Sequence, residues 1–133
     1  MKLRLVVDTS AYAQMRRGNE DALRTIAGAE IVIMPAVVLG ELEAGFRGGN
    51  RYRENALVLE QFLDEPFVTT AAVTRGIAQR YGTIFASLRA RGTPIPTNDI
   101  WIAATALSES AHLVTFDCDF KAVDGLDFTL LKA

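Results

Sequence analysis

Short apolar runs alternate with longer helical stretches along the whole chain, and this alternation is the feature that most restricts its fold. The first run, residues 3–7, is apolar apart from Arg4, as in a strand buried on both faces of a sheet. Further strands are expected at 31–34, 67–69, 112–115 and 128–131, with helices at 19–29, 35–45, 51–63, 73–90 and 99–109. This order predicts a mostly parallel α/β sheet of about five strands, joined by right-handed crossovers.

Length and composition fit one domain. The 133 residues suit a single domain, expected to span 1–133, and an apolar fraction of 50% supplies enough side chains for its core. Cys118 is the only cysteine, which excludes an internal disulfide and fits a reducing compartment. The N-terminal apolar run is too short for a signal peptide or a membrane span. We therefore expect a cytoplasmic protein without a membrane partner.

Two acidic residues come directly after predicted strands. Asp8 closes the first strand, and Asp117 follows the strand at 112–115. Functional sites in parallel sheets form at the carboxyl ends of the strands, near a switch in strand order, so both residues belong at one edge. Thr9 and Ser10 are expected to cap the following helix. That capping would leave the Asp8 carboxylate free for another task.

Two further acids lie beside apolar runs on helices. Glu41 and Glu43 are about 200° apart around one helix, so one points inward and the other outward, and their spacing does not decide which. Asp99 opens a helix with Asn98 as its expected N-cap, where the helix dipole favours a negative charge. Because the sequence IWIAATAL that follows is almost wholly apolar, Asp99 is expected in packed surroundings.

Acidic side chains gathered in an apolar setting have to be neutralised, because an unpaired charge there is very unfavourable. A divalent cation held by carboxylate oxygens does this. Mg²⁺ or Mn²⁺ suits carboxylate ligands without histidine, whereas the soft sulfur of Cys118 is a poor magnesium ligand. The pattern predicts a metal-dependent hydrolase in which a metal-activated water attacks a phosphodiester. Bound cations would also offset part of the formal net charge of −2, which is unusual for a nucleic-acid-binding domain.

The segments VVDTS, LGELEAG, NDIWIAATA and LVTFDCDF, in this order, resemble the PIN domain, and in particular the VapC-type toxins of toxin–antitoxin pairs. The resemblance covers essentially the whole chain and implies a PIN-like fold with helices on both faces of the sheet. It places the catalytic acids of the family at Asp8, Glu41, Asp99 and Asp117, and it selects Glu41 over Glu43. Asp8, Asp99 and Asp117 are implied as the main metal ligands.

The resemblance assigns further residues around these acids. Asp119 matches an additional acid found in some members, so Asp117 and Asp119 remain alternatives for the main fourth acid. Thr9, Ser10 and Thr115 match supporting polar positions. The residues that bind substrate are not identified by this resemblance.

The activity implied by the resemblance is that of an endoribonuclease. An RNA substrate, a cognate antitoxin that blocks the active site and a homodimer are implied with it.

Four arginines of the long helical region either steer RNA, pair with an acidic partner or form a solvated face; they are Arg75, Arg80, Arg89 and Arg91.

Two other functions compete with this interpretation. A catalytically inactive PIN-like module would bind nucleic acid or protein without cutting. An aspartyl-phosphate phosphotransfer domain would use Asp8 as its nucleophile, but it requires a second acid where Ser10 stands and a lysine after a later strand. None of the three lysines of the chain meets that requirement.

Overall fold

A parallel five-stranded sheet organises residues 3–133, the part of the chain that the computed structural model describes; Met1 and Lys2 of the predicted domain lie outside it. The strands are β1 (Arg4–Val7), β2 (Ile31–Pro35), β3 (Val68–Ala71), β4 (His112–Thr115) and β5 (Phe128–Leu130). Their spatial order is β3-β2-β1-β4-β5, and all four neighbouring pairs are parallel. The predicted α/β class is confirmed, with a wholly rather than mostly parallel sheet.

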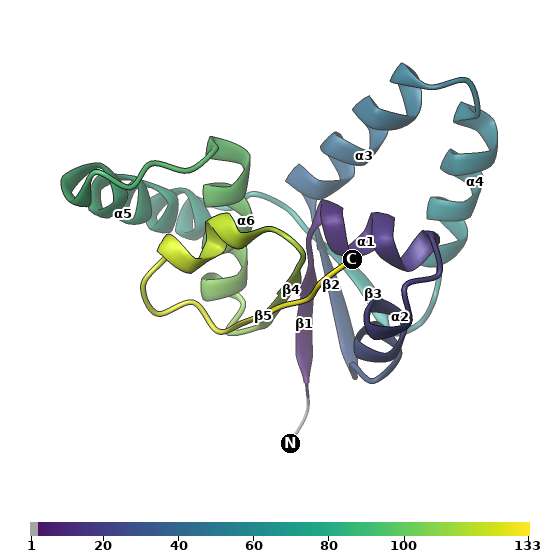
Figure 1. The fold of residues 1–133 in the computed structure, drawn as a ribbon, viewed down its shortest axis with the longest axis horizontal. Coiled ribbons are helices and arrows are strands. Elements are labelled where there is room, and N and C mark those ends of the chain that lie inside the picture. Colours follow the sequence, from purple (N-terminus) through teal and green to yellow (C-terminus); the bar gives the residue numbers. More distant parts are fainter. Residues whose placement is uncertain (1–2) are drawn as a thin grey trace.

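Helices lie on both sides of the sheet (Figure 1). They are α1 (Thr9–Arg16), α2 (Glu20–Ala27), α3 (Ala36–Gly48), α4 (Tyr52–Leu63), α5 (Arg75–Arg91) and α6 (Thr97–Ser108), with a 3₁₀ helix, η1 (Cys118–Ala122). In the view of Figure 1, α5 and α6 are to the left of β1 and β2, whereas α1 to α4 are to the right. None of the described helices is long and apolar enough to cross a membrane.

The direction of the chain across the sheet explains this division. From β1 to β3 the strands are added toward one edge, and the chain then returns past β2 and β1 to form β4 and β5. Since crossovers keep the same right-handed sense, reversing the direction moves the connecting helices to the opposite face. The strand order therefore switches between β1 and β4, whose carboxyl ends flank the position where α/β sheets bind ligands.

The strands and α6 supply much of the core, and buried residues of the other helices complete it. Leu5, Val6 and Val7 of β1 are completely buried, as the apolar run predicted for a central strand. On α6, Ile100 and Ile102 are also buried, and so are the small residues that follow them. This packing fixes the helix that carries Asp99 against the carboxyl ends of the strands.

The predicted end of α3 and the predicted start of α6 are wrong. Helix α3 continues to Gly48 instead of ending near Gly45, because a helical glycine is disfavoured by only about 1 kcal/mol and Phe46 in the last turn packs against the core. Helix α6 begins at Thr97 with Pro96 as its N-cap, so Asn98 lies inside the first turn and does not cap it.

Candidate metal centre

Asp8 lies at the end of β1 and is buried, with 3% of its surface exposed. It is the N-cap of α1, because its Oδ1 accepts a hydrogen bond from the Ala11 amide at 2.8 Å. The prediction that Thr9 and Ser10 would cap this helix in place of Asp8 is therefore wrong. Burial raises the pKa of the Asp8 carboxyl, while hydrogen bonds from Thr115, Ala11 and Ser10 oppose that rise.

Two hydroxyl groups connect Asp8 to the end of β4. Thr115 Oγ1 donates to Asp8 Oδ2 at 2.5 Å and accepts from the Asp117 amide at 2.9 Å. Ser10 Oγ donates to Asp8 Oδ1 at 2.7 Å and accepts from the Phe116 amide at 2.9 Å. Both hydroxyls thus have a donor and an acceptor role, and they hold the Asp8 carboxylate next to the segment that carries Asp117.

Glu41 and Glu43 are separated by their contacts with other elements. Glu41 Oε1 accepts from Thr9 Oγ1 at 2.9 Å, and Oε2 accepts from Asn98 Nδ2 at 2.7 Å. Its carboxylate is therefore fixed between α1 and α6, beside the residues that adjoin Asp8 and Asp99. Glu43 instead contacts Arg47 and Tyr52, at 2.9 and 2.6 Å. The structure thus brings Glu41, and not Glu43, to the other acids.

Asp99 is a buried acid that is repelled by the negative charges of the other four acids of the site. It is 7% exposed, in the first turn of α6. Its pKa is raised from 3.8 to about 7, first by burial and then by the negative charges of Asp117, Asp119, Glu41 and Asp8. Each of these four carboxylates acts on Asp99, so five acids from four segments of the chain lie near one another.

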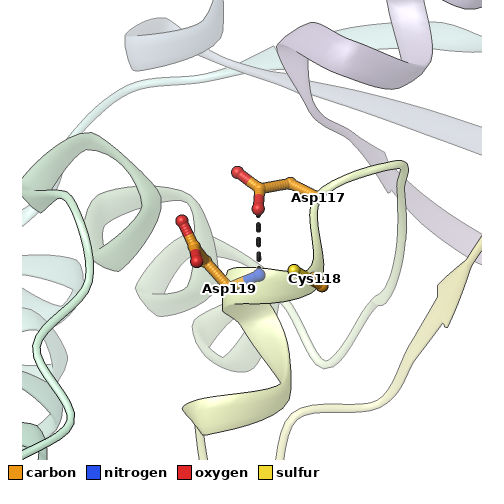
Figure 2. A group of neighbouring side chains, drawn as sticks. All are labelled: Asp117, Cys118 and Asp119. Carbon is orange, nitrogen blue, oxygen red and sulfur yellow. Dashed lines mark hydrogen bonds between the residues drawn. The ribbon is translucent and has the colours of Figure 1, made fainter.

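Asp117 and Asp119 belong to the turn that follows β4 (Figure 2). Asp117 caps η1, since its Oδ1 accepts from the Asp119 amide at 2.9 Å. The two carboxylates extend to the same side of the chain in Figure 2. Ligand atoms of Asp117, Cys118 and Asp119 lie within 4.8 Å of one another. Cys118 is exposed, and its soft sulfur does not suit the oxygen-preferring cations that match the neighbouring carboxylates.

The donor chemistry of the cluster fits a hard divalent cation. Its ligands are carboxylate oxygens, which Mg²⁺ and Mn²⁺ prefer. Within residues 3–133, none of the five acids forms an ion pair with a lysine, an arginine or the histidine. Without a protein cation among these residues to pair with it, burial and the negative charges of the neighbouring acids raise the pKa of Asp99.

Asn98 is the residue of this site that the sequence did not reveal. Its local context, directly before an acidic helix start, is typical of an N-cap. Its amide instead reaches Glu41, 57 positions earlier in the chain. Its position next to Asp99 was the sequence signal for a role in the site. That position alone does not distinguish a helix cap from a residue that contacts the acids.

Comparisons with known proteins identify the fold and the family of the chain. The chain is 27% identical to Ribonuclease VapC4 of Mycobacterium tuberculosis over 124 residues, which cover 93% of this chain and 94% of the relative. The solved structure of VapBC2 from Rickettsia felis bound to a promoter DNA fragment superposes with a TM-score of 0.86 at 20% identity, covering 98% of this chain and 100% of that one.

A second solved structure is similar in sequence as well as in fold. VapBC-5 from Mycobacterium tuberculosis, a member of the VapBC family of toxin–antitoxin systems, superposes with a TM-score of 0.74 at 27% identity, covering 98% of both chains. The family described as the PIN domain matches residues 5–126, which include all five acids. The chain belongs to the PIN domain family.

Proposed function

We propose that this chain is a divalent-metal-dependent endoribonuclease and the toxin of a VapBC-type toxin–antitoxin pair. One observation carries the proposal: five carboxylates surround the carboxyl ends of β1 and β4, and among the described residues no protein cation pairs with them. Relatives named as ribonucleases, at below 30% identity, support RNA as the substrate class.

Each acid has a proposed role that follows from its contacts. Asp8, Asp99 and Asp117 would hold the ion, with Asp119 as an additional ligand from the same turn as Asp117. Glu41 is kept in place by Thr9 and Asn98, so its orientation does not depend on the ion. When bound, Mg²⁺ or Mn²⁺ would lower the pKa of a coordinated water and stabilise negative charge on the phosphodiester under attack.

The phosphotransfer alternative is disfavoured by the hydrogen bonds on Asp8. A phosphoryl acceptor needs a carboxylate oxygen that is free to attack phosphorus. Here Oδ1 accepts from Ala11 and Ser10, while Oδ2 accepts from the buried hydroxyl of Thr115. The carboxylate is 3% exposed and is better placed to hold a cation at the end of the sheet than to act as a nucleophile.

A cleavage assay tests the proposed activity. Purified protein is incubated with total RNA and with single-stranded RNA in Mg²⁺, in Mn²⁺ and in EDTA, and the cleavage ends are mapped. We expect cleavage with either metal, none in EDTA, and none from the Asp99→Asn variant in any condition. Asp64→Asn, at the exposed C-cap of α4, is the matched control and should cleave as the wild type does. Cleavage by folded Asp99→Asn would contradict the assignment.

The proposal includes an antitoxin partner and a homodimer. The solved structures of VapBC assemblies described above support the antitoxin partner, since their chains share this fold, and the homodimer is proposed from the family resemblance. If the protein is instead an inactive binding module, calorimetric titration with Mn²⁺ will give no saturable binding. The toxin assignment is supported if binding is saturable and disappears in Asp99→Asn. It also requires that the antitoxin encoded next to this protein suppresses the cleavage of RNA.

A further inference from the structure

The segment 66–98 has a charge balance opposite to that of the whole chain. It contains Arg75, Arg80, Arg89 and Arg91 and none of the 16 acidic residues. Within the described residues, the guanidinium groups of Arg75, Arg80 and Arg89 form no ion pair or hydrogen bond, whereas Arg91 contacts Ala122 and Asp124. Helix α5, which carries all four, extends away from the sheet in Figure 1. Unpaired arginines on a projecting helix attract a polyanion.

An apolar hollow of about 310 Å³ lies at the C-terminal end of α5. Its lining includes Phe85, Leu88, Arg89, Pro94, Ile95 and Ile100. Phe85 is 40% exposed, which is unusual for a large apolar side chain. The hollow is at the small end of the range for ligand sites. It therefore suits one flat ring better than a longer peptide segment.

Phe85 continues a series of aromatic rings that begins inside the domain. Trp101 on α6 stacks on Tyr81 with ring centroids 4.0 Å apart and an angle of 22° between the planes. The Tyr81 and Phe85 centroids are 6.0 Å apart, with an angle of 25°. The two inner rings are partly buried against the core, so they hold the position of Phe85. An exposed ring that is fixed in this way offers a face on which a nucleobase can stack.

The hollow is connected to the metal centre by the chain itself. Residues 92–96 leave the end of α5 and lead into α6, where the Asp99 amide donates to the Pro96 carbonyl at 3.1 Å. Ile100, which lines the hollow, directly follows Asp99. The hollow and the candidate metal centre therefore both adjoin the first turn of α6.

We propose that α5 and this hollow form the binding surface for single-stranded RNA, an inference that rests on the nuclease function proposed above. One base stacks on Phe85 inside the hollow, and Arg89 at its rim binds an adjoining phosphate. Arg75, toward the N-terminal end of α5, attracts the rest of the strand, whereas Arg80 lines hollows on another face of the helix and adds only to its general positive charge. This arrangement gives the chain a local cationic surface although its formal net charge is −2.

The charges favour RNA over a second copy of this chain as the occupant. A twofold interface sets the same patch of both subunits together. On this segment such contact would oppose arginines with arginines, because no acidic residue of 66–98 is available to pair with them. A phosphate backbone has no such conflict.

Binding measurements without divalent metal test this surface separately from catalysis. Fluorescence anisotropy with a short labelled single-stranded RNA in EDTA compares the wild type with Phe85→Leu, which keeps apolar volume but removes the ring. We expect affinity to fall about tenfold. Arg89→Gln should lower the slope of log affinity against log salt by about 0.7, the contribution of one phosphate contact to a single strand. Arg53→Gln, an exposed arginine on α4, should match the wild type.

Unchanged affinity in Phe85→Leu and an unchanged salt slope in Arg89→Gln would overturn the inference. If either variant instead converts a dimer to a monomer in analytical ultracentrifugation while RNA affinity stays the same, the surface joins copies of the chain and the inference also fails. Cleavage by the wild type in Mn²⁺ is measured in parallel. Its absence would reject the proposed nuclease, whereas its presence without an effect at Phe85 and Arg89 would reject only the RNA surface.

Discussion

Thr115 Oγ1 donates a hydrogen bond to Asp8 Oδ2 at 2.5 Å, joining residues that are 107 positions apart in the sequence. The same hydroxyl accepts from the Asp117 amide, so one atom connects the ends of β1 and β4. Thr115 is completely buried. Both partners would consequently lose a hydrogen bond inside the protein if this hydroxyl were removed.

Replacing Thr115 by valine should therefore lower the free energy of unfolding by about 1–3 kcal/mol, the usual penalty for leaving buried polar groups unpaired. Thr115→Ser keeps the hydroxyl and serves as the control, with a smaller loss from the missing methyl group. Urea denaturation followed by circular dichroism measures both variants. Equal stability of Thr115→Val and the wild type would show that the hydroxyl has no structural role.

Metal binding should stabilise the folded protein through Asp99. A ligand that binds only the folded state at 100 times its dissociation constant adds about 2.7 kcal/mol to the free energy of unfolding. We expect Mn²⁺ to raise the melting temperature of the wild type and to leave that of Asp99→Asn unchanged, in differential scanning calorimetry. In EDTA, Asp99→Asn should be at least as stable as the wild type, because the substitution removes a charge that four neighbours repel.

The raised pKa of Asp99 gives the metal-free protein a pH-dependent stability. In the unfolded chain this carboxyl releases its proton near 3.8, whereas in the folded protein it keeps the proton up to about 7. Between these values the folded state binds more protons, so the free energy of unfolding falls as pH rises from about 4 to about 7 and then levels off. Asp8 contributes in the same direction.

Thermal melts in EDTA across this pH range measure the effect, and Asp99→Asn should show a shallower decline. Because a cation binds the ionised carboxylate, added Mn²⁺ should stabilise the protein more as pH approaches 7. A melting temperature of the wild type that does not vary with pH would contradict the raised pKa of Asp99.

Glu41 and Glu43 offer a matched comparison two residues apart. Glu41→Gln removes the charge but keeps the shape, and we expect Mn²⁺ affinity to fall about 10- to 100-fold, as is typical when residues that support a metal site are changed. Glu43→Gln alters contacts with Arg47 and Tyr52 only, so affinity should match the wild type. Isothermal titration calorimetry distinguishes the two. An equal loss in both variants would indicate a general effect on α3 instead of a local one.

The sequence predicted the strands and the edge of the sheet better than it predicted contacts between elements. Asp8 and Asp117 could be placed because each directly follows a short apolar run, and parallel strands end at a common edge. The choice between Glu41 and Glu43 depended on resemblance, since helical spacing describes only their relative angle. In the structure Glu41 accepts hydrogen bonds from Thr9 and Asn98, and both partners are far away in sequence.

Two of the wrong predictions, those on helix caps, have a similar origin. Asn98 has the local signature of an N-cap, but Pro96 occupies that position and the Asn98 amide is used across the fold. Thr9 and Ser10 were expected to cap α1. Instead the Thr9 hydroxyl donates to Glu41, the Ser10 hydroxyl donates to Asp8, and Asp8 is the N-cap. Local preference was outweighed in each case by a carboxylate that needed a donor.

The parallel pairing of β1 with β4 sets Val7 opposite Val114. Side chains alternate along a strand, so adding or deleting one residue within β4 would rotate Thr115 to the other face of the sheet and away from Asp8. Such a change would disrupt the acidic cluster although the sequence would still contain every acid. Natural variants of this protein should accordingly vary in length at the turn between α3 and α4, while the spacing from β4 to Asp117 stays constant.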